Sequence, residues 1–158
     1  MKILIVSDSH RENSNLLKVL DKVKPDALIH CGDIEGSEYV VSTAAGCPVY
    51  MVSGNNDYFS DLPQEKEVTL EGVKIWIVHG HRQRCYMGVG LLVDEAAQKG
   101  ADVVCYGHTH MPSVQCESGI WAVNPGSISY PRQQNRKPSY CIMEIKKDKS
   151  VSFDIKYL

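Results

Sequence analysis

Strand-length segments, mostly apolar, recur along this chain, and polar residues follow directly at the carboxyl end of five of them. The segments are residues 2–6, 26–30, 48–52, 73–78 and 102–106. Continuous apolar runs of this length are typical of strands that are covered on both faces. The polar residues that follow are Asp8 and His10, Asp33, Asn55, His79, and His108 with His110. Because ligands in open α/β sheets lie at the carboxyl ends of the strands, we expect these side chains to share one crevice.

Helical patterns separate the first three predicted strands, and hairpins dominate the second half of the chain. Helices are expected over residues 14–23, 37–45 and 89–99, where apolar residues fall on one face or a glycine follows the last turn. Tight turns near residues 71–72, 117–119 and 147–149 predict three hairpins, the first joining strands 68–70 and 73–78. This order indicates one α/β domain over residues 1–158, with a mixed sheet or two packed sheets.

Composition limits the classes of partner. A length of 158 residues with 43% apolar residues is enough for one domain with a real core. The net charge of −2 predicts no general attraction to nucleic acid or to anionic membranes. No apolar run approaches a membrane span, and the N-terminus meets a charged residue too early for a signal peptide. We therefore expect a cytoplasmic protein with neither membrane nor nucleic acid as partner. Its six cysteines are expected to be reduced.

Each polar residue has a structural explanation when it is taken alone. Asp8, Asp33 and Asn55 could be turn formers, and His79 could be a core histidine. His108 and His110 are harder to explain in this way, because two histidines that flank one residue of an extended segment project to the same side. Together the set favours metal binding. Imidazole, carboxylate and amide donors without a thiolate suit first-row divalent ions, and their number suggests two ions that share a carboxylate.

Five motifs in this order resemble those of the calcineurin-like metallophosphoesterases. They are Asp8-x-His10, Gly32-Asp33, Gly54-Asn55-Asn56-Asp57, His79, and Gly107-His108-Thr109-His110. The later Asn124-Pro125-Gly126-Ser127 also resembles the small bacterial and archaeal phosphodiesterase branch of the family. The resemblance implies a four-layer α/β/β/α sandwich, in which two mixed β-sheets pack together and helices flank them.

The resemblance also implies two divalent ions and assigns their ligands. Asp8, His10 and His110 would bind one ion, Asn55, His79 and His108 would bind the other, and Asp33 would bridge them. Mn²⁺ is the preferred ion, with Ni²⁺, Fe²⁺ and Zn²⁺ as alternatives. Two ions roughly 3.5–4 Å apart can activate a shared hydroxide and stabilise an in-line displacement at phosphorus. The expected activity is hydrolysis of small phosphate diesters, with Asp33, Asn55, His108 and His81 as catalytic residues.

One position departs from the family pattern. Many members carry a histidine where this chain has Asn56, and an amide cannot act as a general acid. His81 could replace that function, although an exposed loop histidine is an equally good interpretation. Three loop arginines, Arg82, Arg84 and Arg132, could hold a phosphate, and at least two of them are expected to be solvated surface charges.

The sequence leaves two alternative functions open, a protein-binding scaffold and a nuclease. A protein-binding scaffold of the same fold would be favoured by a degenerate metal set, whereas here the set is intact. A nuclease is disfavoured by the slightly acidic charge and by the absence of basic runs. A homo-oligomer, either a dimer or a tetramer, is a further expectation.

Overall fold

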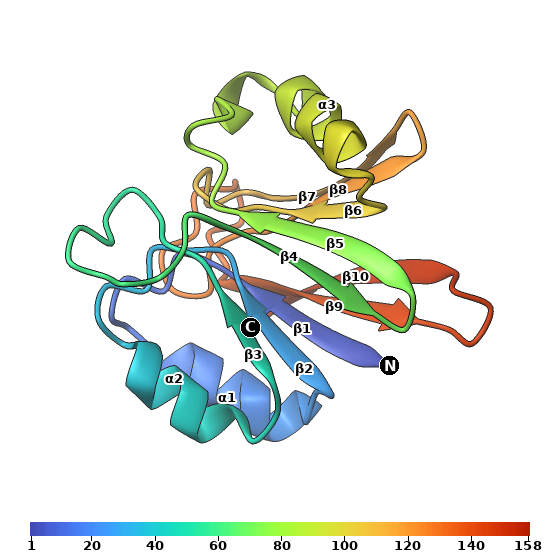
Figure 1. The fold of residues 1–158 in the computed structure, drawn as a ribbon. Helices are drawn as coiled ribbons and strands as arrows, with labels where there is room; N and C mark the ends of the chain where they lie inside the picture. The colour runs from blue at the N-terminus through green and yellow to red at the C-terminus, as the bar shows by residue number, and fades with distance from the viewer.

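The structure is a computed structural model that describes residues 1–158, and its core is a pair of five-stranded sheets packed face to face. Two helices cover the outer face of one sheet and a third helix covers the outer face of the other (Figure 1). The layers therefore follow the order α/β/β/α. This arrangement confirms the fold class that the sequence predicted.

The first sheet is mixed and contains both ends of the chain. Its strands lie in the order β10, β9, β1, β2 and β3. Strands β1, β2 and β3 are parallel, whereas β9 runs antiparallel to β1 and to β10. The bounds are β1 Lys2–Val6, β2 Ala27–His30, β3 Val49–Met51, β9 Ser139–Ile145 and β10 Val151–Tyr157.

The second sheet has a matching plan. Its strands lie in the order β4, β5, β6, β8 and β7. Strands β5, β6 and β8 are parallel in the centre, and the edge strands β4 and β7 run antiparallel to their neighbours. The bounds are β4 Glu65–Leu70, β5 Val73–Val78, β6 Val103–Cys105, β7 Pro112–Glu117 and β8 Ile120–Pro125.

Alternating side chains divide the core into three layers. Because successive residues of a strand point to opposite faces, Ile3 and Ile5 of β1 pack between the sheets, whereas Leu4 and Val6 face the helices. The helices are α1 (Ser14–Val23) and α2 (Glu38–Ala45) on the first sheet and α3 (Gly90–Lys99) on the second. This packing fixes the central parallel strands of both sheets from both sides.

Two local elements differ from the sequence prediction. Strand β4 begins at Glu65 rather than at residue 68, because Lys66, Val68 and Leu70 alternate with exposed residues on an edge strand. A 3-10 helix, η1 (Cys85–Met87), occupies a stretch for which the sequence predicted no helix or strand. The other predicted helices and strands are present, with ends that differ by one residue or a few. No helix of the structure is long and apolar enough to cross a lipid bilayer.

Candidate metal centre

The predicted donors meet where the parallel strands of the two sheets end. The donors lie in the loops that follow β1, β2 and β3 of the first sheet and β5 and β6 of the second sheet. Four of the donor residues are buried, with at most 4% of their surface exposed, and the other three are half-buried. The buried donors are Asp8, Asp33, His79 and His110, and the half-buried ones are His10, Asn55 and His108.

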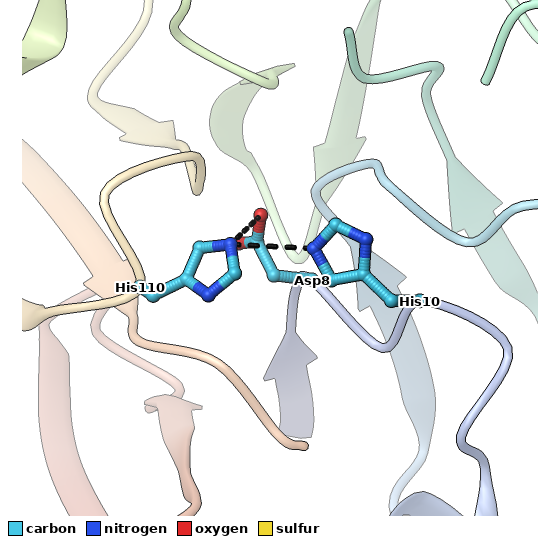
Figure 2. Close-up of side chains that lie close together, drawn as sticks. All are labelled: Asp8, His10 and His110. Carbon is cyan, nitrogen blue, oxygen red and sulfur yellow. Dashed lines mark hydrogen bonds and ion pairs between the residues drawn. The ribbon is translucent and has the colours of Figure 1, made fainter. Parts of the chain in front are cut away.

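Asp8, His10 and His110 form the first group of donors. Oδ1 of Asp8 lies 3.2 Å from Nε2 of His110. Nε2 of His10 lies 3.3 Å from the same nitrogen. Figure 2 shows both rings turned toward the carboxylate, from opposite sides of it. One donor atom from each residue falls within 4.8 Å of the others, a spacing that a single cation can span.

Hydrogen bonds on the far side of each ring orient the two histidines. Nδ1 of His10 lies 2.6 Å from Oε1 of Glu35, and Nδ1 of His110 lies 2.6 Å from the carbonyl oxygen of Tyr130. Such outer partners fix the tautomer and leave the opposite nitrogen free for an ion. In both rings that nitrogen is Nε2, the atom that faces the centre.

Asn55, His79 and His108 form the second group. Oδ1 of Asn55 lies 3.0 Å from Nε2 of His79 and 2.8 Å from Nδ1 of His108. The His79 ring is oriented by a contact of 2.8 Å between its Nδ1 and the carbonyl oxygen of Cys31. An amide oxygen and two ring nitrogens therefore converge on one small volume.

Two carboxylates lie between the groups. Oδ2 of Asp33 is 3.4 Å from Nε2 of His79 and 3.8 Å from Nε2 of His10. Asp8, Asp33 and His79 also form a set of donor atoms within 4.8 Å of one another. Asp33 thus lies between the two groups, and its role as a bridging ligand stays a prediction. The closeness of Asp8 to the second group as well was not anticipated from the sequence.

The residues fit a bound cation, because one buried carboxylate oxygen has no hydrogen-bond partner. Asp8 is fully buried, and its Oδ2 accepts the backbone N–H of His108 at 3.1 Å. Its Oδ1 forms no hydrogen bond. The nearest ring nitrogen to this oxygen is Nε2 of His110, at 3.2 Å. A buried carboxylate oxygen that accepts no hydrogen bond is costly, so its position suits a positive ion. The donors are nitrogen and oxygen atoms only, which suits a divalent first-row metal.

The electrostatics of the centre keep its carboxylates ionised. Burial would raise the pKa of Asp33, but His79 and the amide groups of Asn56 hold that pKa below its ordinary value. Burial would likewise raise the pKa of Asp8, but the rings of His110 and His79 keep it lowered. Burial opposes the charge of His79, yet the two carboxylates raise its pKa to about 9. A metal ion must displace this proton when it binds.

The backbone of the donor loops is strained. Positive φ angles occur at Asp8 (55°), His10 (46°), Asp33 (56°), His108 (67°) and His110 (58°), although none of these residues is glycine. Non-glycine residues adopt this conformation rarely, and such residues cluster at functional sites. The fold therefore holds five of the seven donors in a conformation that costs free energy.

Asp57 is a positioning residue whose importance was not inferred from the sequence, although it belongs to one of the motifs. Its buried carboxylate accepts backbone N–H groups of Asp33 at 2.8 Å, Glu35 at 2.6 Å and Gly54 at 2.7 Å, and also that of Ile34. These bonds join the loop after β2 to the loop after β3. Asp33 and Asn55 are thereby fixed relative to each other.

The later Asn-Pro-Gly-Ser turn supports the donor loops rather than supplying donors. The hydroxyl of Ser127 donates to the carbonyl oxygen of Asp8 at 2.7 Å. The amide of Asn124 donates to the carbonyl oxygen of Gly107 at 2.8 Å. Both side chains are buried, and they connect the loop after β8 to the loops that carry Asp8 and His108.

His81 lies beside the second group of donors. Its ring centroid is 5.4 Å from that of His79 and 6.0 Å from that of His108, and its buried Nδ1 has no hydrogen-bond partner. Among the three loop arginines, Arg132 lies in a cleft with His10 and His110, and Arg82 lies in a crevice with His79 and His81. Arg84 is exposed before η1.

Comparisons with known proteins show which sequences and structures this chain resembles. The family description "Calcineurin-like phosphoesterase superfamily domain" matches residues 1–148. The chain is 35% identical over 150 residues to the probable metallophosphoesterase YsnB of Bacillus subtilis, an alignment that covers 94% of this chain and 86% of that protein. It is 29% identical to a phosphodiesterase of Methanocaldococcus jannaschii over 146 residues, which cover 80% of this chain and 83% of the relative.

A solved structure is similar over nearly the whole fold. It is that of a predicted phosphoesterase from Streptococcus pneumoniae TIGR4, with a TM-score of 0.82 and 29% sequence identity. The match covers 99% of this chain and 97% of the other. The similarity therefore includes both sheets and all the loops that carry the donors.

Proposed function

The chain belongs to the calcineurin-like phosphoesterase superfamily and is a metal-dependent phosphoesterase, and we propose that it hydrolyses small phosphate diesters with two bound divalent ions. The observation that carries this proposal is the position of Asp33. Its Oδ2 reaches toward one histidine of each donor group, at 3.4 Å from His79 and 3.8 Å from His10. A carboxylate placed in this way can serve two ions at once.

Different residues of the chain would hold the metal ions and supply a proton during hydrolysis. In the overall reaction, a water oxygen bonds to phosphorus, one P–O ester bond breaks, and the leaving oxygen takes a proton. Bound divalent ions lower the pKa of water and stabilise the oxygens of an in-line displacement. The seven donors would hold the ions in place, and the protein offers no serine nucleophile of the Gly-x-Ser-x-Gly type. His81 stands beside the second group of donors, where a leaving oxygen could take its proton.

Several observations support diesters and an enzyme rather than the other function classes. A relative that shares 29% identity is named a phosphodiesterase. A protein-binding scaffold would not need seven metal donors in a strained and buried arrangement. A net charge of −2 gives a nuclease no general attraction to a polyanion. The nitrogen and oxygen donors suit Mn²⁺, and they also suit Ni²⁺, Fe²⁺ and Zn²⁺. The cytoplasmic location and the homo-oligomeric state stay predictions from the sequence.

A chromogenic diester tests this proposal. Bis(p-nitrophenyl) phosphate should be hydrolysed with Mn²⁺ and not with a chelator, and faster than the monoester p-nitrophenyl phosphate. Asp33→Asn and His108→Ala should each retain less than a tenth of the wild-type kcat, a loss of more than about 1.4 kcal/mol of transition-state stabilisation. Asp61→Asn, an exposed carboxylate in the loop after β3, is the matched control. Full activity of Asp33→Asn at saturating Mn²⁺ would exclude the bridging role.

A further inference from the structure

A cleft with two arginines opens beside the first group of donors. We call it the arginine cleft, and its volume is about 670 Å³. It is lined by His10 and His110, by the segment from Ser129 to Arg132, and by Arg136. No carboxylate is among its lining residues. A volume of this size exceeds the space that one phosphate needs and falls in the range of small-molecule sites.

The two guanidinium groups of the arginine cleft have no partner within the protein. The ion pairs of the chain include Arg11 with Glu35, but none includes Arg132 or Arg136. The backbone of Arg132 is nevertheless bonded to the metal centre, where its N–H donates to the carbonyl oxygen of His110 at 3.1 Å. Both arginines are exposed at the cleft, and unpaired guanidinium groups there can receive a carboxylate or a phosphate.

A second cleft near the metal centre has the reverse charge. This cleft, on the side of α2, is lined by Glu35, Glu38, Asp57 and Asp61, with Arg11 as its one basic residue. Glu35 already contacts both His10 and Arg11. An anionic group attached to a substrate is therefore repelled by the second cleft and attracted by the arginine cleft.

From this asymmetry we infer that the arginine cleft binds a second anionic group of the substrate, separate from the ester phosphate. The substrate class is thus a phosphodiester in which one ester arm carries a carboxylate or a phosphate. The alternative explanation is that Arg132 and Arg136 are solvated surface charges. The inference rests on the proposed diesterase function, and the experiment below separates the two.

Two substrates that differ only in the charge of one ester arm measure how much that charge contributes to kcat/KM. The probes are p-nitrophenyl 2-carboxyethyl phosphate and p-nitrophenyl 2-carbamoylethyl phosphate, which share the leaving group and differ by one negative charge. A third probe, with a 2-phosphonoethyl arm, distinguishes a phosphate-like anion from a carboxylate. The wild type with Mn²⁺ should prefer the anionic arms by about tenfold in kcat/KM, mainly through KM, as expected for a charge-assisted contact at a partly exposed site.

Two glutamine variants assign the preference to the cleft. Arg132→Gln and Arg136→Gln should each reduce it, and the double variant should abolish it, so that the anionic and carbamoyl probes then react with equal kcat/KM. Lys137→Gln, which removes an exposed charge from the same loop without touching the cleft, should leave the preference unchanged. Equal kcat/KM for all arms in the wild type would overturn the inference and leave the diesterase function standing.

A binding measurement tests the anion site even if the protein hydrolyses no diester. Titration calorimetry of the Mn²⁺-loaded protein with 2-carboxyethylphosphonate and 2-carbamoylethylphosphonate needs no turnover. Tighter binding of the carboxylate, lost in the double arginine variant, would support the anion site even if the diesterase proposal failed. Equal affinity for the two phosphonates would overturn the inference.

Discussion

The side-chain amide of Asn56 donates to Oδ2 of Asp33 at 2.7 Å, and the backbone N–H of Asn56 donates to Oδ1 at 2.8 Å. One residue thus orients both oxygens of the carboxylate that lies between the two donor groups. In the sequence Asn56 stood out because the resemblance to the family implies a histidine at this position. In the structure the Asn56 side chain instead bonds to Asp33, the predicted bridging ligand, and helps to hold it in place.

Loss of the Asn56 side chain should weaken metal binding. In Asn56→Ala the Oδ2 atom of Asp33 loses its amide donor, and loss of such an outer partner typically costs about 10–100-fold in metal affinity. Calorimetric titration with Mn²⁺ measures the Kd directly. Asn135→Ala, in an exposed loop, should bind Mn²⁺ like the wild type. An unchanged Kd in Asn56→Ala would mean that this contact does not orient Asp33.

Asp57→Asn should destabilise the fold as well as the metal centre. The Asp57 carboxylate accepts four backbone N–H groups, and an amide in its place turns one acceptor atom into a donor that faces other donors. The free energy of unfolding of the metal-free protein should fall by about 2–3 kcal/mol, as when buried donors lose a charged acceptor. Urea unfolding measures this change. Asp61→Asn in the same loop should shift the midpoint very little, and equal midpoints for the two variants would refute the role given to Asp57.

Most of the fold and the positions of the donors could be predicted because they depend on local patterns. Each apolar run ends where a polar donor begins, and the parallel strands bring these ends to one edge. The role of Asp57 could not be predicted in this way. Its hydrogen bonds reach backbone groups more than 20 residues away, and those groups carry no sequence signal. The start of β4 was placed too late, because Glu65 and Lys66 are charged and the edge strand shows alternation rather than an apolar run.

His30 should make the stability of the protein depend on pH. The ring is fully buried, Nδ1 accepts the N–H of Gly32 at 3.3 Å, and Nε2 lies 3.1 Å from the hydroxyl of Ser9. Burial is the main cause that lowers its pKa from 6.5 to about 4. The unfolded chain therefore binds more protons than the folded one between these values. The contribution of His30 is complete above pH 6.5 and is lost as the pH falls toward 4.

The variant His30→Gln separates the contribution of His30 to the pH dependence of stability from that of the other titrating groups. Between pH 7 and pH 5 the wild type should lose about 2 kcal/mol more stability than the variant, since the other titrating groups are common to both. Urea unfolding with a chelator present at both pH values gives the two differences. Parallel losses in the two proteins would show that His30 does not titrate as its burial implies.

The leaving oxygen of a diester needs a proton when the P–O bond breaks. The Asn56 amide is engaged with Asp33 and cannot act as an acid, whereas the Nδ1 atom of His81 has no partner and its ring adjoins those of His79 and His108. We therefore expect His81 to supply the proton. General acid catalysis is typically worth about 10²–10⁴-fold and matters most for poor leaving groups. His81→Ala should thus slow the hydrolysis of alkyl diesters by about 100-fold and leave p-nitrophenyl diesters, whose phenolate leaves unaided, within a few-fold of the wild type.

The measurement is the dependence of kcat on leaving-group pKa, which should be shallow in the wild type and steep in His81→Ala. Arg82→Gln, a change in the neighbouring residue of the same crevice, should lower all rates in proportion and keep the wild-type slope. A steep slope already in the wild type, unchanged in His81→Ala, would show that no side chain assists the leaving group.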